Sequence, residues 1–147
     1  MNNHTKIIGY TAGGFDMFHI GHLNLLRSSR SMCDHLIVGV STDELIKRMK
    51  KKSPVICFEE RMQIVASVRY ADTVVVQADV DKMAAWERYK FNLMFSGDDW
   101  KGTERWQGIE ADLAKVGALV IYFPYTQHTS SSKLSQALDV LSAGDDY

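Results

Sequence analysis

Cysteine and proline are both scarce in this sequence. Two residues of each kind occur in 147 residues. Cys33 and Cys57 have neither the density of a secreted disulfide scaffold nor the spacing of a metal knuckle, which favours a reducing cytoplasm as the location. Because no Ser/Gly-rich linker interrupts the chain, residues 1–147 are predicted to form a single domain with a frayed tail over about 143–147.

An excess of one charge and long apolar runs are missing as well. The 17 Lys and Arg residues balance 18 Asp and Glu residues, so the molecule lacks the positive field that a nucleic-acid-binding protein presents. No window approaches the roughly 20 apolar residues of a membrane-spanning helix, and the N-terminus has no secretory signal pattern. We therefore expect a cytoplasmic protein that binds neither nucleic acid nor membrane.

The sequence does contain a regular alternation of short apolar runs and amphipathic segments. The apolar runs, rich in β-branched residues, predict five strands: Lys6–Thr11, His35–Ser41, Thr73–Gln77, Leu93–Ser96 and Ala118–Phe123. Helical periodicity predicts six helices: Gly21–Met32 (with Leu23, Leu26 and Met32 inward), Thr42–Met49, Glu59–Tyr70, Met83–Tyr89, Glu104–Val116 and about Ser131–Ser142. This alternation indicates an α/β fold, a doubly wound (Rossmann-like) five-stranded parallel sheet with helices on both faces.

The turn after the first strand carries the residues best suited to chemistry. It reads TAGGFDMFHIGH and lies at the carboxyl end of a strand, where open α/β sheets bind ligands. Gly13 and Gly14 permit close approach of a ligand, and the next helix points its free N–H groups at the same space. His19 and His22 share one face of that helix and both reach a phosphate there. The same residues are also compatible with a helix cap beside a solvated histidine, or with a zinc site that includes Asp16.

A second compositional feature is the run KRMKKK at Lys47–Lys52. It is interpreted either as a solvated helix end or, because of its position after the second strand, as a mobile lid that closes on bound phosphates.

Several motifs carry a resemblance to a known family. GGFDMFHIGH resembles the GTFDxxHxGH signature of the nucleotidyltransferase superfamily. DHLIVGVSTDE, ERMQIVASVRYAD, FSGDDWKG and TSSSKL follow in the order and at the spacings of the glycerol-3-phosphate cytidylyltransferase-like family. The chain is similar to that family from about Ile7 to Leu138, which is most of its length.

The resemblance implies a reaction and the residues that carry it. The reaction is transfer of CMP from CTP to a small phosphorylated alcohol, with glycerol 3-phosphate as the leading acceptor. The implied catalytic residues are His19, His22, Lys52 and Arg61. The implied nucleotide-binding residues are Gly13, Gly14, Phe15, Asp16, His19, His22, Asp99, Trp100, Thr126, Ser130 and Ser131. The implied substrate-binding residues are Lys50, Lys52, Arg61 and Tyr125.

The resemblance also implies a cofactor and an assembly. Mg²⁺ or another divalent cation would bridge the triphosphate, with Asp16 as a candidate ligand through water. The implied assembly is a homodimer, with Arg69 and Asp72 either at its contact or in a structural ion pair. Trp100 is expected to stack on a base.

Departures from the family pattern leave the acceptor open. Gly14 replaces a threonine, Tyr125 replaces an arginine and His128 replaces a glycine. Without that arginine, the same transfer to a polyol phosphate, phosphocholine or a capsule precursor stays open. The HxGH turn is also compatible with an ATP-using transferase and with a nucleotide-sensing module that has lost catalysis.

Overall fold

The structure is a computed structural model that describes residues 5–126 and 131–144. Five strands form one sheet in the order β3-β2-β1-β4-β5, and every neighbouring pair is parallel. The strands are β1 (Ile8–Gly13), β2 (His35–Ser41), β3 (Thr73–Gln77), β4 (Leu93–Gly97) and β5 (Leu119–Phe123). The strand order reverses between β1 and β4, which is the point where such sheets bind ligands at their carboxyl edge.

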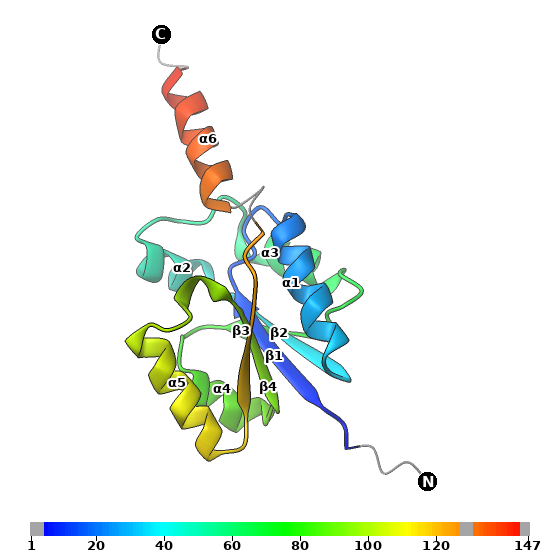
Figure 1. Cartoon of the computed structure of the whole chain (residues 1–147). Coiled ribbons are helices and arrows are strands. Elements are labelled where there is room, and N and C mark those ends of the chain that lie inside the picture. The colour runs from blue at the N-terminus through cyan, green and yellow to red at the C-terminus, as the bar shows by residue number, and fades with distance from the viewer. Residues whose placement is uncertain (1–4, 127–130, 145–147) are drawn as a thin grey trace.

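Helices cover both faces of the sheet, as Figure 1 shows. They are α1 (Ile20–Ser31), α2 (Asp43–Lys50), α3 (Phe58–Ala66), α4 (Lys82–Tyr89), the 3₁₀ turn η1 (Asp98–Trp100), α5 (Glu104–Lys115) and α6 (Ser131–Gly144). Helices α1 and α3 lie on one face, α4 and α5 on the other, and α6 projects away from the sheet (Figure 1). The predicted fold class is confirmed.

Alternation along the central strands builds the two apolar layers. Leu36 and Val38 of β2 face α1 and α3, where they pack with Leu26 and Val65. Tyr10 of β1 and Ile37 of β2 face the other way, toward a layer that includes Trp106 and Leu113 of α5. Successive side chains of a strand point to opposite faces, so a strand buried on both sides must be apolar throughout.

Some predicted boundaries and contacts differ from the structure. The first strand starts two residues later than predicted and extends through Gly13, and α3 ends at Ala66, before the predicted Tyr70. Met32, predicted to face inward, caps the end of α1 and is exposed. The predicted tail is helical through Gly144, and its last residues lie outside the described ranges.

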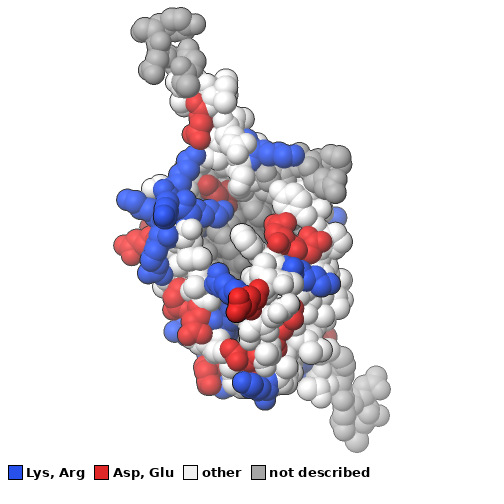
Figure 2. Space-filling view, turned by 60° about the vertical axis from the view of Figure 1, so that its left-hand side comes forward, with Lys and Arg blue, Asp and Glu red and all other residues white. Residues whose placement is uncertain are grey.

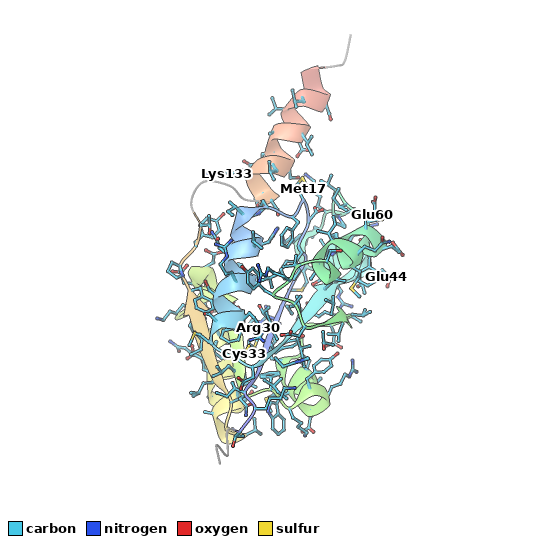
Figure 3. All side chains as sticks on the ribbon, turned by 90° about the vertical axis from the view of Figure 1, so that its right-hand side faces the viewer. Met17, Arg30, Cys33, Glu44, Glu60 and Lys133 are labelled. Carbon is cyan, nitrogen blue, oxygen red and sulfur yellow. The ribbon has the colours of Figure 1, made fainter. Side chains whose placement is uncertain are left out.

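Of the two alternatives for Arg69 and Asp72, the structural ion pair between them does not form. Asp72 instead accepts from Arg30 Nε at 2.8 Å and from the backbone N–H of Leu36 at 2.8 Å, which ties α1 to the start of β2. Arg69 lies over the ring of Tyr70. Figure 3 shows Arg30 at the end of α1 that is far from α6.

Within the described ranges, no helix combines the length and the apolar character that crossing a membrane requires.

Candidate active site

The turn between β1 and α1 has an unusual backbone. Phe15 and Met17 have φ angles of 54° and 49°, in the left-handed region that residues with a side chain rarely adopt. The ring of Phe15 is buried in the apolar core and contacts the ring of His22 edge-on. We therefore infer that burial of this aromatic ring holds the turn in its strained form. Phe15, predicted to bind the nucleotide, is 4% exposed, so little of its side chain is open to a ligand.

His19 and His22 are fixed by the backbone of the helix that they begin. His19 is the N-cap of α1, and its Nδ1 accepts the N–H of Gly21 at 3.0 Å. The Nδ1 of His22 accepts the N–H of His19 at 3.2 Å. A ring nitrogen that accepts an N–H carries no proton, so each neutral imidazole has its proton on Nε2. Both rings therefore present an N–H donor.

Gly21 makes this arrangement sterically possible. A Cβ at this position would lie 2.8 Å from Cε1 of His19. The centroids of the two imidazole rings are 3.9 Å apart, so the ring of His19 has little room to move aside. The glycine of the HIGH sequence is thus required for the position of the first histidine.

The two histidines are neutral near physiological pH. The pKa of His22 is lowered to about 3, chiefly by burial and in part by the nearby His19 and Lys50, while Asp16 opposes the effect. Burial also lowers the pKa of His19. Both side chains are thus suited to stabilise developing negative charge by hydrogen bonding rather than by carrying a positive charge.

Two clefts open at the carboxyl edge of the sheet. The lysine cleft has a volume of about 300 Å³ and is lined by Gly14, Asp16, Lys52, Ser53, Ser135 and Gln136 among others. The histidine cleft has a volume of about 360 Å³ and is lined by His19, Asn24, Ser28, Asp99, Tyr125 and Thr126 among others. Four residues line both clefts: His22, Lys50, Ser131 and Ser132. The two clefts therefore meet at a wall of hydrogen-bond donors and one cation.

The basic run borders this meeting point. Lys50 lines both clefts and Lys52 lines the lysine cleft, while Lys47, Arg48 and Lys51 are exposed beside them. Figure 2 shows Lys and Arg side chains gathered on this side of the molecule, below the base of α6. The Nζ of Lys52 donates to Ser135 Oγ and Asp139 Oδ2, each at 2.8 Å.

Asp16 fastens the segment that follows the basic run. Its two carboxylate oxygens accept the backbone N–H groups of Val55 and Ile56, each at 2.8 Å. Its backbone carbonyl accepts the hydroxyl of Ser131 at 2.6 Å, which ties the first turn of α6 to the turn after β1. Figure 3 shows Met17 of this turn close to Lys133 of α6. The described residues contain no group of three His, Cys, Asp or Glu that could hold a metal ion, so the zinc interpretation finds no support among them.

Arg61 lies under the site rather than in it. Its side chain is fully buried, and its guanidinium donates to the carbonyls of Gly14, Ser41 and Ile56 at 2.6, 2.7 and 2.9 Å. It also pairs with Asp43 at 2.7 Å. Direct contact with substrate, which the family resemblance implies for Arg61, would require these bonds to break. In this structure Arg61 is a positioning residue for the turn and the basic segment.

The remaining predicted residues divide between the clefts and their surroundings. Asp99, Tyr125 and Thr126 line the histidine cleft, whereas Trp100 is 61% exposed and lines neither cleft. Gly13 ends β1 and also lines neither cleft. Ser130 and His128 lie outside the described residues. The stacking of Trp100 on a base stays a prediction.

Sequence reasoning missed several residues that line the clefts. Asn24 and Ser28 line the histidine cleft, and Asn24 Nδ2 donates to Thr126 Oγ1 at 3.3 Å. Asn24 and Ser28 are polar residues four apart on one face of the helix, at helical spacing from Gly21, and this spacing is the signal that could have revealed them. Gly14, where the family has a threonine, has Ile46 close by: a Cβ would lie 3.1 Å from Cδ1 of that side chain.

Comparison with known proteins identifies the family. The model of the family described as "Cytidylyltransferase-like" matches residues 10–137. The chain belongs to the cytidylyltransferase-like family. This confirms the sequence-based resemblance and the prediction that the protein is an enzyme of the nucleotidyltransferase type.

Curated relatives of this cytidylyltransferase-like chain have closely related names. It is 35% identical over 129 residues to the glycerol-3-phosphate cytidylyltransferase of Staphylococcus aureus, covering 87% of this chain and 92% of that one. It is 31% identical over 140 residues to the Bacillus subtilis enzyme of the same name, covering 90% and 96%. The ethanolamine-phosphate cytidylyltransferase of Dictyostelium discoideum is 38% identical over 96 residues, which are 64% of this chain and 26% of that one.

A solved structure supports the fold. The lipopolysaccharide core biosynthesis protein from Thermoplasma volcanium matches with a TM-score of 0.69 and 23% sequence identity, covering 85% of this chain and all of that one.

The first prediction concerns Arg61. We expect Arg61→Lys to lower the free energy of unfolding by about 2–4 kcal/mol, because an ammonium cannot serve the carbonyls and the carboxylate that the guanidinium bonds, and buried acceptors are left unsatisfied. Denaturant unfolding measures the change. Arg69→Lys is the control, since Arg69 is exposed. Equal stability of the two variants would contradict the positioning role of Arg61.

The second prediction concerns pH. Because the pKa of His22 in the folded protein is about 3 and a histidine in the unfolded chain titrates near 6.5, the unfolded state binds more protons between these values. The free energy of unfolding should therefore fall as pH decreases from about 6.5 toward 3. His22→Asn keeps an acceptor for the N–H of His19 but does not titrate, so its loss of stability between pH 7.5 and 4.5 should be smaller. Equal losses in wild type and variant would show that His22 titrates normally.

Proposed function

We propose that this protein transfers CMP from CTP to a small phosphorylated alcohol, with release of pyrophosphate, and that glycerol 3-phosphate is the acceptor. The observation that carries the proposal is the meeting of two clefts at His22, Lys50, Ser131 and Ser132. The reaction has to bring two anions together, and a shared wall of donors and one cation suits that task. The names of the Staphylococcus aureus and Bacillus subtilis relatives support the choice of acceptor.

The two clefts suggest a place for each substrate. In our proposal the nucleoside lies in the histidine cleft, beside Asn24, Asp99 and Thr126, and its triphosphate extends over the Nε2–H groups of His19 and His22. The acceptor phosphate lies in the lysine cleft between Lys50 and Lys52. The N-terminal turns of α1 and α6 add backbone N–H groups to the same region.

The chemistry requires orientation and charge stabilisation. An oxygen of the acceptor phosphate forms a bond to the α-phosphorus of CTP, and the bond from that phosphorus to the bridging oxygen of the leaving pyrophosphate breaks. The nucleophile is already an anion, so no strong general base is needed. His19 and His22 are neutral donors in the folded protein, so they stabilise the charge of the leaving group without giving up a proton.

The cofactor proposed for this reaction is Mg²⁺ or another divalent cation. Such an ion would reduce the negative charge of the triphosphate, and because Mg²⁺ commonly keeps several waters it would need few protein ligands. Asp16 fits an outer role, because each of its oxygens already accepts one backbone N–H and can still accept from a metal-bound water. The cytoplasmic location and the homodimer stay predictions.

The charges of the lysine cleft favour an acceptor with an uncharged end. Lys50 and Lys52 both line this cleft, and the carboxylate that lines it, Asp16, already accepts two backbone N–H groups. A cationic head such as that of phosphocholine or phosphoethanolamine would meet like charge there. Glycerol 3-phosphate or another polyol phosphate would not meet this repulsion. Tyr125 lines the histidine cleft, so it does not contribute to the choice of acceptor in the lysine cleft.

The third prediction tests the reaction itself. Pyrophosphate release should be fastest with CTP and glycerol 3-phosphate among a panel of four nucleoside triphosphates and several phosphorylated acceptors, and it should stop when a chelator removes the divalent cation. A higher kcat/KM with another acceptor would redirect the proposal to that acceptor. Binding of CTP without turnover on any acceptor would favour the nucleotide-sensing module instead.

The fourth prediction concerns the two histidines. His19→Asn and His22→Asn each keep a side-chain acceptor near the position of Nδ1 but lack the Nε2–H donor, so each should lower kcat by about 10²-fold or more while α1 stays folded. Steady-state kinetics and circular dichroism measure the two effects. His35→Asn is the matched control, because His35 lies at the start of β2, at the other end of the sheet, beside Thr73. Near-normal turnover of both site variants would remove the histidines from the mechanism.

A further inference from the structure

Lys52 reaches across the lysine cleft to α6. Its ammonium donates to Ser135, which lines the cleft, and to Asp139, one helical turn farther along α6. The side chains of Lys52 and Asp139 are 53% and 65% exposed. The lysine that we assign to the acceptor phosphate is therefore held by a carboxylate and a hydroxyl that resemble, in charge and geometry, part of a phosphate group.

This contact is weak enough to be exchanged. An exposed ion pair contributes about 0–1 kcal/mol, since water screens it and two long side chains must be ordered to form it. A phosphate monoester carries up to two negative charges and three strong acceptor oxygens, so it can replace one carboxylate and one hydroxyl as the partner of an ammonium.

The segment around Lys52 is fixed elsewhere. Asp16 holds Val55 and Ile56 through both carboxylate oxygens, and Ser131 ties the first turn of α6 to the backbone carbonyl of Asp16. Release of Lys52 from Asp139 would thus leave residues 55–56 and the first turn of α6 in place, so the lysine alone can change partner.

We propose that Asp139 and Ser135 are positioning residues that hold the ammonium of Lys52 at the edge of the lysine cleft, and that the phosphate of the acceptor displaces Asp139 on binding. The inference rests on the proposed function, because it takes the lysine cleft as the acceptor site. Asp139 then competes with the acceptor for Lys52, so this carboxylate lowers the affinity of the cleft for phosphate and has no part in the transfer step.

The fifth prediction tests this competition. Asp139→Asn keeps the size of the side chain but removes its charge, and it should lower the KM for the acceptor by about two- to five-fold, the range that an exposed ion pair can supply. The KM for CTP and kcat should stay near their wild-type values, because neither depends on the release of Lys52. Ser135→Ala should lower the acceptor KM by a smaller factor. An acceptor KM that rises or stays the same in Asp139→Asn overturns the inference.

Two controls separate competition from a general change of charge. Glu87→Gln removes one negative charge from an exposed pair with Lys90 on α4 and should leave the acceptor KM unchanged. In a Lys52→Gln background, Asp139→Asn should no longer lower the acceptor KM, because the side chain for which Asp139 competes is gone. The same decrease with and without Lys52 would show a long-range effect of charge and overturn the inference.

A binding experiment keeps this inference distinguishable from the proposed function. Calorimetry with inorganic phosphate and the full chain should show tighter binding to Asp139→Asn than to wild type, and the difference should vanish in the Lys52→Gln background. If wild type turns over none of the acceptors, the proposed function fails while this measurement still decides the exchange at Lys52. Equal phosphate affinity of wild type and Asp139→Asn contradicts the exchange, whatever the activity.

Discussion

One buried guanidinium holds together the segments that form the active site. Arg61 donates to three carbonyls: that of Gly14, which begins the turn after β1, that of Ser41, the last residue of β2, and that of Ile56 in the segment before α3. These carbonyls lie outside regular helices and strands or at the end of a strand. They therefore lack a backbone N–H partner within a helix or sheet and need another hydrogen-bond donor. Only an arginine offers enough donors in one plane to serve them, and Asp43 balances its charge. The turn with the histidines and the segment after the lysines therefore share one anchor.

The bonds that begin α1 also prepare its two histidines for chemistry. Gly21 N–H bonds His19, and His19 N–H bonds His22, so the free N–H groups of the first turn determine which ring nitrogen carries the proton. Burial then keeps both rings neutral. The same few contacts therefore cap α1, set the tautomer of each imidazole and direct its N–H donor. The strained turn at Phe15 and Met17 is held by the ring of Phe15, which is buried in the core.

Positive charge is supplied separately, by a segment that the tertiary structure brings over the clefts. Lys50 and Lys52 come from the end of α2 and the residues that follow it, and their exposure leaves them able to change partners. Asp16 fastens that segment, and the hydroxyl of Ser131 fastens the start of α6 to the same residue. A rigid pair of donors next to exposed cations suits a reaction that brings two anions together.

Sequence alone determined the order of the elements and the position of the HIGH turn, because apolar periodicity, glycine placement and motif spacing are local properties. It also singled out both histidines, Lys50 and Lys52, which the structure brings to the lining of the two clefts. Tertiary structure decided what each remaining polar residue bonds. The side chain of Arg61 is buried beneath the clefts. Asp72 pairs with Arg30 and not with Arg69, and Trp100 lines neither cleft. Lys52 meets Asp139 across 87 residues of sequence. These partners lie on elements that are far apart in the sequence. The periodicity of apolar residues along the chain predicts each element but not the distance between two of them.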